Sequence, residues 1–274
     1  MPMKVIDRFD IQNQNIIITG AAGNLGFYHA YSVLEKGGNP ILLDINKKKL
    51  IETRDKLSSI FNKKISFHKI NLTKKIELKK LFKSFKSNKI PIHALINNAD
   101  INSKYNELNK NFRIEKLNLA FWNKHLNIGL TSNFLISSIY YLYLLNLKLK
   151  GHIINISSDL GIISPDHRLY FDLKKKSNEQ NVKPISYSVV KHGLIGITKY
   201  FSTYDTNLLR CNAIAFGGVK VKDKNFEKKV SKLVPLKRMA NADEYITTIQ
   251  YLLSPSNSYI NGSTIVVDGG RTII

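Results

Sequence analysis

The fold is decided by the stretch IIITGAAGNLG at residues 16–26. Its three isoleucines form a continuous apolar run, which is typical of a strand buried on both faces of a parallel sheet. Gly20, Gly23 and Gly26 then allow a sharp turn and a close backbone approach before a helix expected over residues 25–36. Because a helix N-terminus offers N–H groups and partial positive charge, the pattern predicts a pyrophosphate site. The alternative is an ordinary turn.

The rest of the chain alternates short apolar runs with lysine-rich amphipathic stretches. Helices are expected at residues 47–61 and 76–86. Further strands are expected at residues 41–43, 65–67, 94–96, 152–156, 210–214 and 264–267. Apolar strands separated by helices predict an α/β fold, a Rossmann-type doubly wound parallel β-sheet with helices on both faces. We expect one domain over residues 1–274.

The composition restricts the kinds of partner and site. The 274 residues carry a formal net charge of +22, but 35 of the 42 basic residues are lysine. Surfaces that read nucleic acid favour arginine, so we expect no nucleic-acid partner. The single cysteine, Cys211, excludes an intramolecular disulfide framework, and the histidines show no ligand spacing, so no metal site is expected.

Two segments of the sequence bear on the cellular location of the protein. Residues 1–7 contain no apolar core of a signal peptide. The most apolar long stretch, residues 126–149, is too rich in polar residues for a membrane-spanning helix and is expected to be a buried or interface helix. We therefore expect a cytoplasmic protein with no membrane partner.

Asp44 follows the second expected strand, 18 residues after Gly26. A carboxylate at this place accepts hydrogen bonds from both hydroxyls of an adenosine ribose and repels a 2′-phosphate. The sequence therefore favours NAD over NADP as cofactor, although the lysines at 47–49 lie close by. A second interpretation is that Asp44 caps the following helix.

A catalytic pattern lies further along the chain. Tyr187 and Lys191 stand four residues apart at the start of an expected helix, so both can face one site. A nearby ammonium group stabilises tyrosinate and lowers the tyrosine pKa, which would let Tyr187 exchange a proton near neutral pH. Ser157 and Ser158 end the fifth expected strand, where ligands of such sheets bind. Taken alone, Tyr187 and Lys191 could also be a surface pair.

With these motifs the chain resembles the short-chain dehydrogenase/reductase family over about residues 10–272. The resemblance implies hydride and proton transfer with NAD(P). It implies that Tyr187 is the catalytic acid/base, that Lys191 binds the nicotinamide ribose, and that Ser158 positions the substrate oxygen. It also implies that Asn127 holds a relay water near Lys191.

The same resemblance implies the residues that line the cofactor. They are Gly20, Ala22, Gly23, Asn24, Leu25, Gly26, Asp44, Asn71, Leu72, Asn98, Ala99, Tyr187, Lys191, Gly217 and Val219. The chain departs from the family pattern at several positions. Asp100 replaces a usual glycine, Phe216 replaces a proline, and Val221 stands where a threonine is common. The glycine spacing is that of a larger epimerase branch, but the chain ends soon after residues 267–270, which favours the compact branch.

An insertion at residues 160–186 separates Ser158 from Tyr187 and is expected to be a substrate loop. Asp159, Arg168 and Tyr170 are the candidate substrate residues, and their donors and acceptors suit a sugar or a phosphorylated compound. The lysine-rich part, residues 174–181, is expected to be a solvated spacer. The loop is similar to that of flagellin-modification protein A oxidoreductases, which implies a nonulosonic-acid or surface-glycan pathway.

Other functions stay open at this point. The first is a 3-oxoacyl-acyl-carrier-protein reductase-like enzyme, and the second is a non-catalytic family member that binds NAD. The resemblance further implies a homodimer or homotetramer. The apolar helix expected over about residues 122–147, with Tyr140, Tyr141 and Tyr143, is the candidate interface.

Overall fold

The computed structural model describes residues 8–101, 112–116, 118–172 and 174–274. Seven parallel strands form one sheet in the order β3-β2-β1-β4-β5-β6-β7. The strands are β1 (Asn15–Thr19), β2 (Asn39–Asp44), β3 (Ser66–Lys69), β4 (Ala94–Asn97), β5 (Gly151–Ser158), β6 (Leu209–Phe216) and β7 (Thr264–Val267). The Rossmann-type sheet predicted from the sequence is confirmed.

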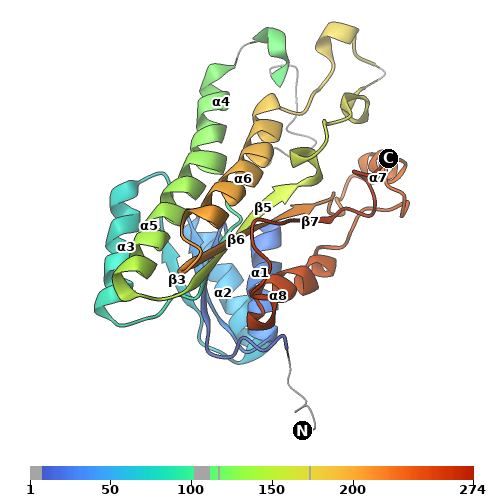
Figure 1. The fold of residues 1–274 in the computed structure, drawn as a ribbon. Helices are drawn as coiled ribbons and strands as arrows, with labels where there is room; N and C mark the ends of the chain where they lie inside the picture. The colour runs from blue at the N-terminus through green and yellow to red at the C-terminus, as the bar shows by residue number, and fades with distance from the viewer. Residues whose placement is uncertain (1–7, 102–111, 117, 173) are drawn as a thin grey trace.

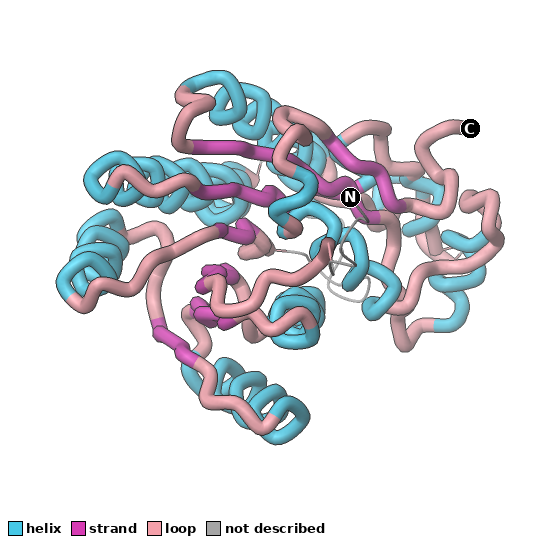
Figure 2. Tube along the Cα trace, turned by 60° about the horizontal axis from the view of Figure 1, so that its bottom comes forward, coloured by secondary structure: helices cyan, strands magenta, loops and turns pink. Residues whose placement is uncertain are grey.

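Helices cover both faces of the sheet (Figures 1 and 2). On one face lie α1 (Asn24–Glu35), α2 (Lys47–Phe61) and α8 (Ile246–Leu253). On the other lie α3 (Lys75–Ser87), α5 (Ser132–Leu147) and α6 (Ile185–Tyr204). Two shorter helices, α4 (Leu119–Leu126) and α7 (Lys224–Ser231), stand beyond the carboxyl ends of the strands (Figure 1).

The apolar run in β1 shows why the strands are apolar at every position. Ile16 and Ile18 belong to the core on the α1 face, whereas Ile17 belongs to the core on the α3 face. All three side chains are fully buried. Because successive side chains of a strand point to opposite faces, a strand covered on both sides has no solvent-facing position.

The tyrosines of the expected interface helix are core residues instead. Tyr140 and Tyr143 are buried beside Phe82 of α3. Their hydroxyls donate to the carbonyl oxygens of Ile92 and Ile90, respectively, which satisfies the buried polar tips. The expectation that these two tyrosines lie exposed at an interface is therefore wrong, because their face of α5 packs on α3.

The stretch Leu119–Leu147 is long and apolar enough to span a membrane by length and composition alone. Half of its most apolar window is buried inside the protein, and core helices of water-soluble proteins pass the same test. On α5 the large apolar side chains that stay exposed are Phe134, Leu142 and Leu145.

The insertion contains three short 3₁₀ helices, at Asp159–Gly161, His167–Tyr170 and Ser177–Glu179. Its middle part packs against α7, where the Tyr170 ring stacks on Phe226 with centroids 5.8 Å apart. Lys229 of α7 donates from Nζ to the carbonyl oxygen of Phe171. The insertion therefore joins the end of β5 to the start of α6 while resting on α7.

The glycine turn provides a test of the fold. A Cβ atom on Gly26 would collide with the carbonyl oxygen of Gly20 and lie 2.7 Å from Ala21 Cα. Since backbone atoms cannot give way cheaply, we expect Gly26→Ala to lower the free energy of unfolding by about 1–3 kcal/mol or more. Urea denaturation followed by circular dichroism measures this change.

Gly196→Ala is the matched control, because nothing lies within 4 Å of a Cβ at this position of α6. Alanine has the higher helix propensity, so this variant should gain about 0.5–1 kcal/mol. Equal stability of the two variants would contradict the packing of the turn described here.

Candidate functional site

The glycine turn lies at the carboxyl end of β1, where α1 begins. Its helix is capped by Gly23, which has no side chain to satisfy the first N–H groups, and no acidic residue stands in the first turn. Gly20 adopts a φ of 63°, and a Cβ there would lie 2.8 Å from Ala99 Cα. The turn thus combines a free helix N-terminus with close-packed backbone, which fits the diphosphate of a dinucleotide.

The turn is tied to the end of β4 by the side chains of Thr19 and Asn98. The Thr19 hydroxyl accepts hydrogen bonds from the N–H groups of Asn98 (2.9 Å) and Ala99 (3.0 Å). In return, Asn98 Nδ2 donates to the carbonyl oxygens of Thr19 (3.0 Å) and Gly20 (3.1 Å). Asn98 and Ala99 are thereby brought beside the turn that the sequence predicted as the cofactor site.

Asp44 lies across from the same turn. Its Oδ2 accepts from the Ala22 N–H at 3.0 Å and its Oδ1 accepts from the Asn46 N–H at 2.8 Å. The α2 helix is capped by the side chain of Asn46, which accepts from the Lys49 N–H. The interpretation of Asp44 as the helix cap is therefore wrong, and its carboxylate instead faces the glycine turn.

The remaining residues predicted to line the cofactor follow neighbouring strands. Asn71 and Leu72 come after β3, and the Asn71 side chain accepts from the N–H and hydroxyl of Thr73. Gly217 and Val219 follow β6, where the Gly217 carbonyl accepts from the Tyr245 hydroxyl. Asn24 and Leu25 open α1. All these residues therefore lie beyond the carboxyl ends of strands.

Ser158, Tyr187 and Lys191 form the predicted catalytic group. Ser158 is the last residue of β5, and the other two lie on one face of α6. All three are buried, and Ser158 is among the neighbours that act on the pKa of Tyr187. Lys191 Nζ donates to the carbonyl oxygen of Ile156 at 3.1 Å. The alternative of a surface pair is wrong for Tyr187 and Lys191.

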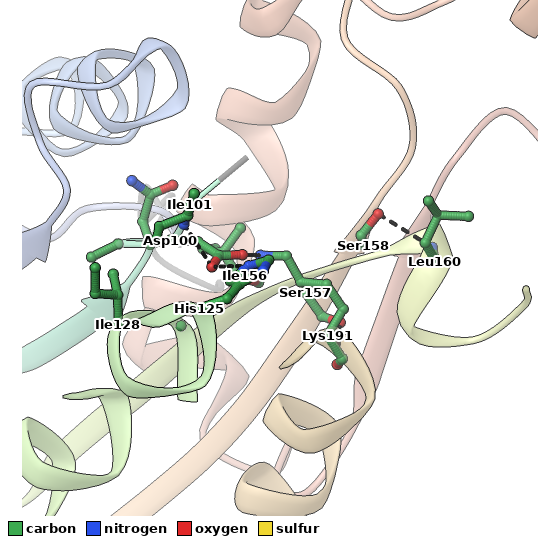
Figure 3. Close-up of polar contacts among 12 residues, drawn as sticks. Asp100, Ile101, His125, Ile128, Ile156, Ser157, Ser158, Leu160 and Lys191 are labelled. Atoms are coloured by element: carbon green, nitrogen blue, oxygen red, sulfur yellow. Dashed lines mark hydrogen bonds and ion pairs between the residues drawn. The ribbon is translucent and has the colours of Figure 1, made fainter. Parts of the chain in front are cut away.

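A carboxylate completes the surroundings of Lys191. Asp100 Oδ2 lies 2.9 Å from Lys191 Nζ, with both side chains less than a tenth exposed. Its Oδ1 lies 3.1 Å from His125 Nε2 (Figure 3). His125 Nδ1 in turn lies 2.9 Å from Ser186 Oγ. Sequence reasoning recorded Asp100 only as a departure from a family pattern, and it missed His125 as a member of the site.

Asn127 does not join this cluster. Its side chain is exposed at the start of a π-helical turn, Asn127–Thr131, between α4 and α5. Gly129 is the residue of this turn that faces Asp100 and Val190. The expected place of Asn127 beside Lys191 is wrong, because Gly129, and not the exposed Asn127, is the residue of this turn that faces the site.

The direction in which the pKa of Tyr187 is shifted also differs from expectation. Burial raises the pKa of Tyr187, Lys191 lowers it, and Asp100 raises it again, so the net direction is upward. Lys191 therefore lowers this pKa as predicted, but burial and Asp100 outweigh its effect, and the expected net lowering is wrong. For Lys191, burial opposes the charged form, but the Asp100 and Tyr187 charges outweigh it and the pKa is raised. Burial likewise opposes ionisation of Asp100, yet Lys191 and His125 hold its pKa below the usual value.

The end of the insertion brings a second lysine to the site. Lys183 is buried with its Nζ 3.9 Å from the centroid of the Tyr187 ring, a cation–π arrangement. Burial lowers the pKa of Lys183 to about 8. Asp159 receives a hydrogen bond from the Ser158 hydroxyl at 2.6 Å, and burial raises the pKa of its carboxyl group. Sequence reasoning missed Lys183, whose position just before the catalytic helix was the available signal.

The other substrate candidates divide into one buried and one exposed residue. Tyr170 is buried, and burial together with the neighbouring Tyr187 and Asp159 raises the pKa of its hydroxyl. Arg168 has a side chain 81% exposed and pairs with Asp166 through two nitrogens. The contacts that the structure gives for the Arg168 guanidinium group are thus with Asp166 at the start of the same 3₁₀ turn. Within the described part of the chain, no three His, Cys, Asp or Glu side chains are grouped to hold a metal ion.

Comparisons with known proteins agree with this geometry. The family model for short chain dehydrogenases matches residues 14–170, and that for enoyl-(acyl carrier protein) reductases matches residues 175–272. The chain is 27% identical to post-translational flagellin modification protein A of Campylobacter coli over 95% of this chain and 98% of the relative. It is 25% identical to a 3-oxoacyl-acyl-carrier-protein reductase of Thermotoga maritima over 96% and 99% of the two chains.

A solved structure is similar over nearly the whole fold. It is a gluconate 5-dehydrogenase from Burkholderia cenocepacia J2315 in complex with NADP and tartrate, with a TM-score of 0.82. The identity is 19%, and 98% of each chain is covered. At this identity the likeness establishes the shared fold.

Proposed function

The chain belongs to the short-chain dehydrogenase family, and from that membership we propose that it is a nicotinamide-dependent oxidoreductase that interconverts an alcohol and a ketone. The observation that carries the proposal is the buried group of Ser158, Tyr187 and Lys191, with the Lys191 ammonium 5.5 Å from the centroid of the Tyr187 ring. All three side chains lie beyond the carboxyl end of β5, where ligands of doubly wound sheets bind.

The geometry supports a separate role for each of Ser158, Tyr187 and Lys191 in ketone reduction. On substrate binding, the Ser158 hydroxyl turns its single proton from Asp159, to which it donates in this structure, to the substrate oxygen and orients it. Tyr187, protonated because its pKa is raised, gives its proton to the same oxygen as the C–O⁻ charge develops. When bound, the nicotinamide cofactor supplies the hydride to the carbonyl carbon. Lys191 remains charged and stabilises the tyrosinate that is left; alcohol oxidation runs these steps in reverse.

The residues around the glycine turn fit a dinucleotide. The free N-terminus of α1 and the backbone of the turn would hold the diphosphate, and Asp44 would accept the ribose hydroxyls. Each carboxylate oxygen of Asp44 receives one backbone N–H and keeps a further lone pair for a ligand. We therefore propose NAD as the preferred cofactor and NADP as the alternative.

The substrate class follows from the groups around Tyr187. Asp159 and Lys183 place a carboxylate and an ammonium group near the reacting oxygen. Such groups favour a substrate that carries hydroxyl or acidic groups near its carbonyl, since an acyl chain would leave them unpaired. We propose a sugar or sugar derivative of a nonulosonic-acid or surface-glycan pathway. The 3-oxoacyl-acyl-carrier-protein reductase activity is the alternative, and the Thermotoga relative favours it.

The remaining proposals concern the oligomeric state, the cellular location and the binding partners of the enzyme. The exposed apolar side chains of α5, with Tyr200 and Tyr204 of α6, offer a surface for a homodimer or homotetramer. We propose a cytoplasmic protein that binds no nucleic acid and no membrane. The buried group of Ser158, Tyr187 and Lys191 argues against a non-catalytic NAD-binding role.

Replacing the acid/base tests the mechanism. We expect Tyr187→Phe to reduce kcat by about 10²–10⁴, because the proton donor is lost while the ring contact to Lys183 is kept. Stopped-flow or steady-state oxidation of NADH with an accepted ketone measures the effect. Tyr141→Phe is the control, since this hydroxyl binds Asp205 away from the site. Unchanged turnover by Tyr187→Phe would refute the proposed role.

Asp44 tests the cofactor assignment. Wild type should bind NADH more tightly than NADPH, and Asp44→Asn should shift the ratio of dissociation constants by about 10–100-fold toward NADPH, since a charged acceptor of the ribose hydroxyls is lost. Fluorescence titration gives both constants. Asp55→Asn, on the exposed side of α2, should leave the ratio unchanged. A wild type that prefers NADPH contradicts the assignment.

A substrate panel tests the proposed class. Keto-sugars and keto-sugar acids should be reduced with NADH, whereas acetoacetyl-CoA, a simple acyl thioester, should not. Asp159→Asn should raise KM for the polyhydroxylated ketones by about 10-fold or more and leave cyclohexanone unaffected, since only the former donate to the carboxylate. Asp166→Asn, in the exposed part of the insertion, serves as control. Preferential reduction of the thioester would establish the alternative activity.

A further inference from the structure

Lys191 has an unusual neighbour for a catalytic lysine. Its ammonium group is buried and lies 2.9 Å from the Asp100 carboxylate. A buried ammonium without an opposite charge is costly, so this contact keeps Lys191 charged in the absence of any ligand. Asp100 comes from the end of β4, three residues after Asn97, and therefore approaches Lys191 from a different element than the helix that carries the lysine.

Asp100 fits at this position because residue 129 is a glycine. A Cβ atom on Gly129 would collide with Asp100 Oδ1 and would lie 2.6 Å from Val190 Cγ1. A side chain at residue 129 would thus enter the space that the carboxylate fills. Gly129 belongs to the π-helical turn, a distortion that is frequent at functional sites.

The second oxygen of Asp100 is fixed as well. Because a carboxylate only accepts hydrogen bonds, His125 must donate from Nε2, while its Nδ1 lies 2.9 Å from the Ser186 hydroxyl. This chain of contacts links β4, α4 and the first turn of α6. The carboxylate is therefore held on both oxygens and cannot easily turn away from Lys191.

We propose that Asp100 is a positioning residue for Lys191 that fills the space left by Gly129, and that its negative charge keeps Tyr187 in the phenol form that donates a proton. The proposal rests on the proposed function. In support, Asp100 raises the pKa of Tyr187 while Lys191 lowers it. The charged and titratable groups that face this cluster are Lys183, His125, Asp159, Tyr187 and Lys191.

The first test measures the ionisation of Tyr187 without any substrate. The tyrosinate absorbance of each protein is titrated with alkali, and the curve of its Tyr187→Phe counterpart is subtracted. We expect Asp100→Asn to move the Tyr187 midpoint to lower pH by about one unit or more, because Lys191 then acts on the phenol unopposed. An unchanged midpoint in folded Asp100→Asn protein overturns the proposal.

The second test measures the packing of residues 100 and 129 and does not depend on Asp100→Asn being folded. Gly129→Asn alone should lower the melting temperature, and adding Asp100→Gly should restore much of the loss, because the new amide takes the vacated space. Asp100→Gly combined with Gly196→Ala should be additive, since nothing lies near a Cβ at residue 196. Additivity of the 100 and 129 changes also overturns the proposal.

Failure of these two tests can be distinguished from failure of the proposed function. If Tyr187→Phe retains turnover but both tests succeed, the acid/base role is wrong and the placement of Asp100 stands. If Tyr187→Phe loses turnover but the midpoint and the melting temperatures fail to respond, the function stands and Asp100 has no positioning role.

Discussion

The contact between the ends of β1 and β4 is the constraint on which the rest of the site depends. The Thr19 hydroxyl receives two backbone N–H groups from the end of β4, and Asn98 returns two hydrogen bonds to the glycine turn. Here the order of strands reverses direction along the sheet, which is where such folds bind their ligands. Because Asp100 follows Asn98 by two residues, the same contact delivers a carboxylate to Lys191.

Much of the fold and part of the site could be predicted, because the sequence patterns that indicate them lie within one strand or one turn of a helix. The isoleucines of β1, the glycines of the turn, Asp44 after β2, and the Tyr187 and Lys191 spacing each follow from the geometry of one strand or one helix turn. Ser158 followed from its place at the end of β5. These features need no knowledge of what packs against them.

The wrong and missing predictions concern residues whose positions depend on how one helix or strand packs against another. Tyr140 and Tyr143 were expected at an interface because α5 is apolar around most of its circumference, and only the packing of α3 decides which face is buried. Asn127 was expected at Lys191 because an amide there resembles a known pattern, but Gly129 is the residue of the π turn that faces inward. Lys183 was missed because the chain is rich in lysine, and its position just before α6 distinguishes it only once its burial is seen.

The close fit between Gly129 and Asp100 also limits how the sequence can change over time. A side chain at residue 129 would collide with the Asp100 carboxylate, so that position can gain one only after Asp100 has been replaced by something smaller. Loss of Asp100 first leaves a buried lysine without its counter-charge. Replacement of either residue alone is therefore disfavoured. We expect Gly129 and Asp100 to be kept together or replaced together as the sequence diverges.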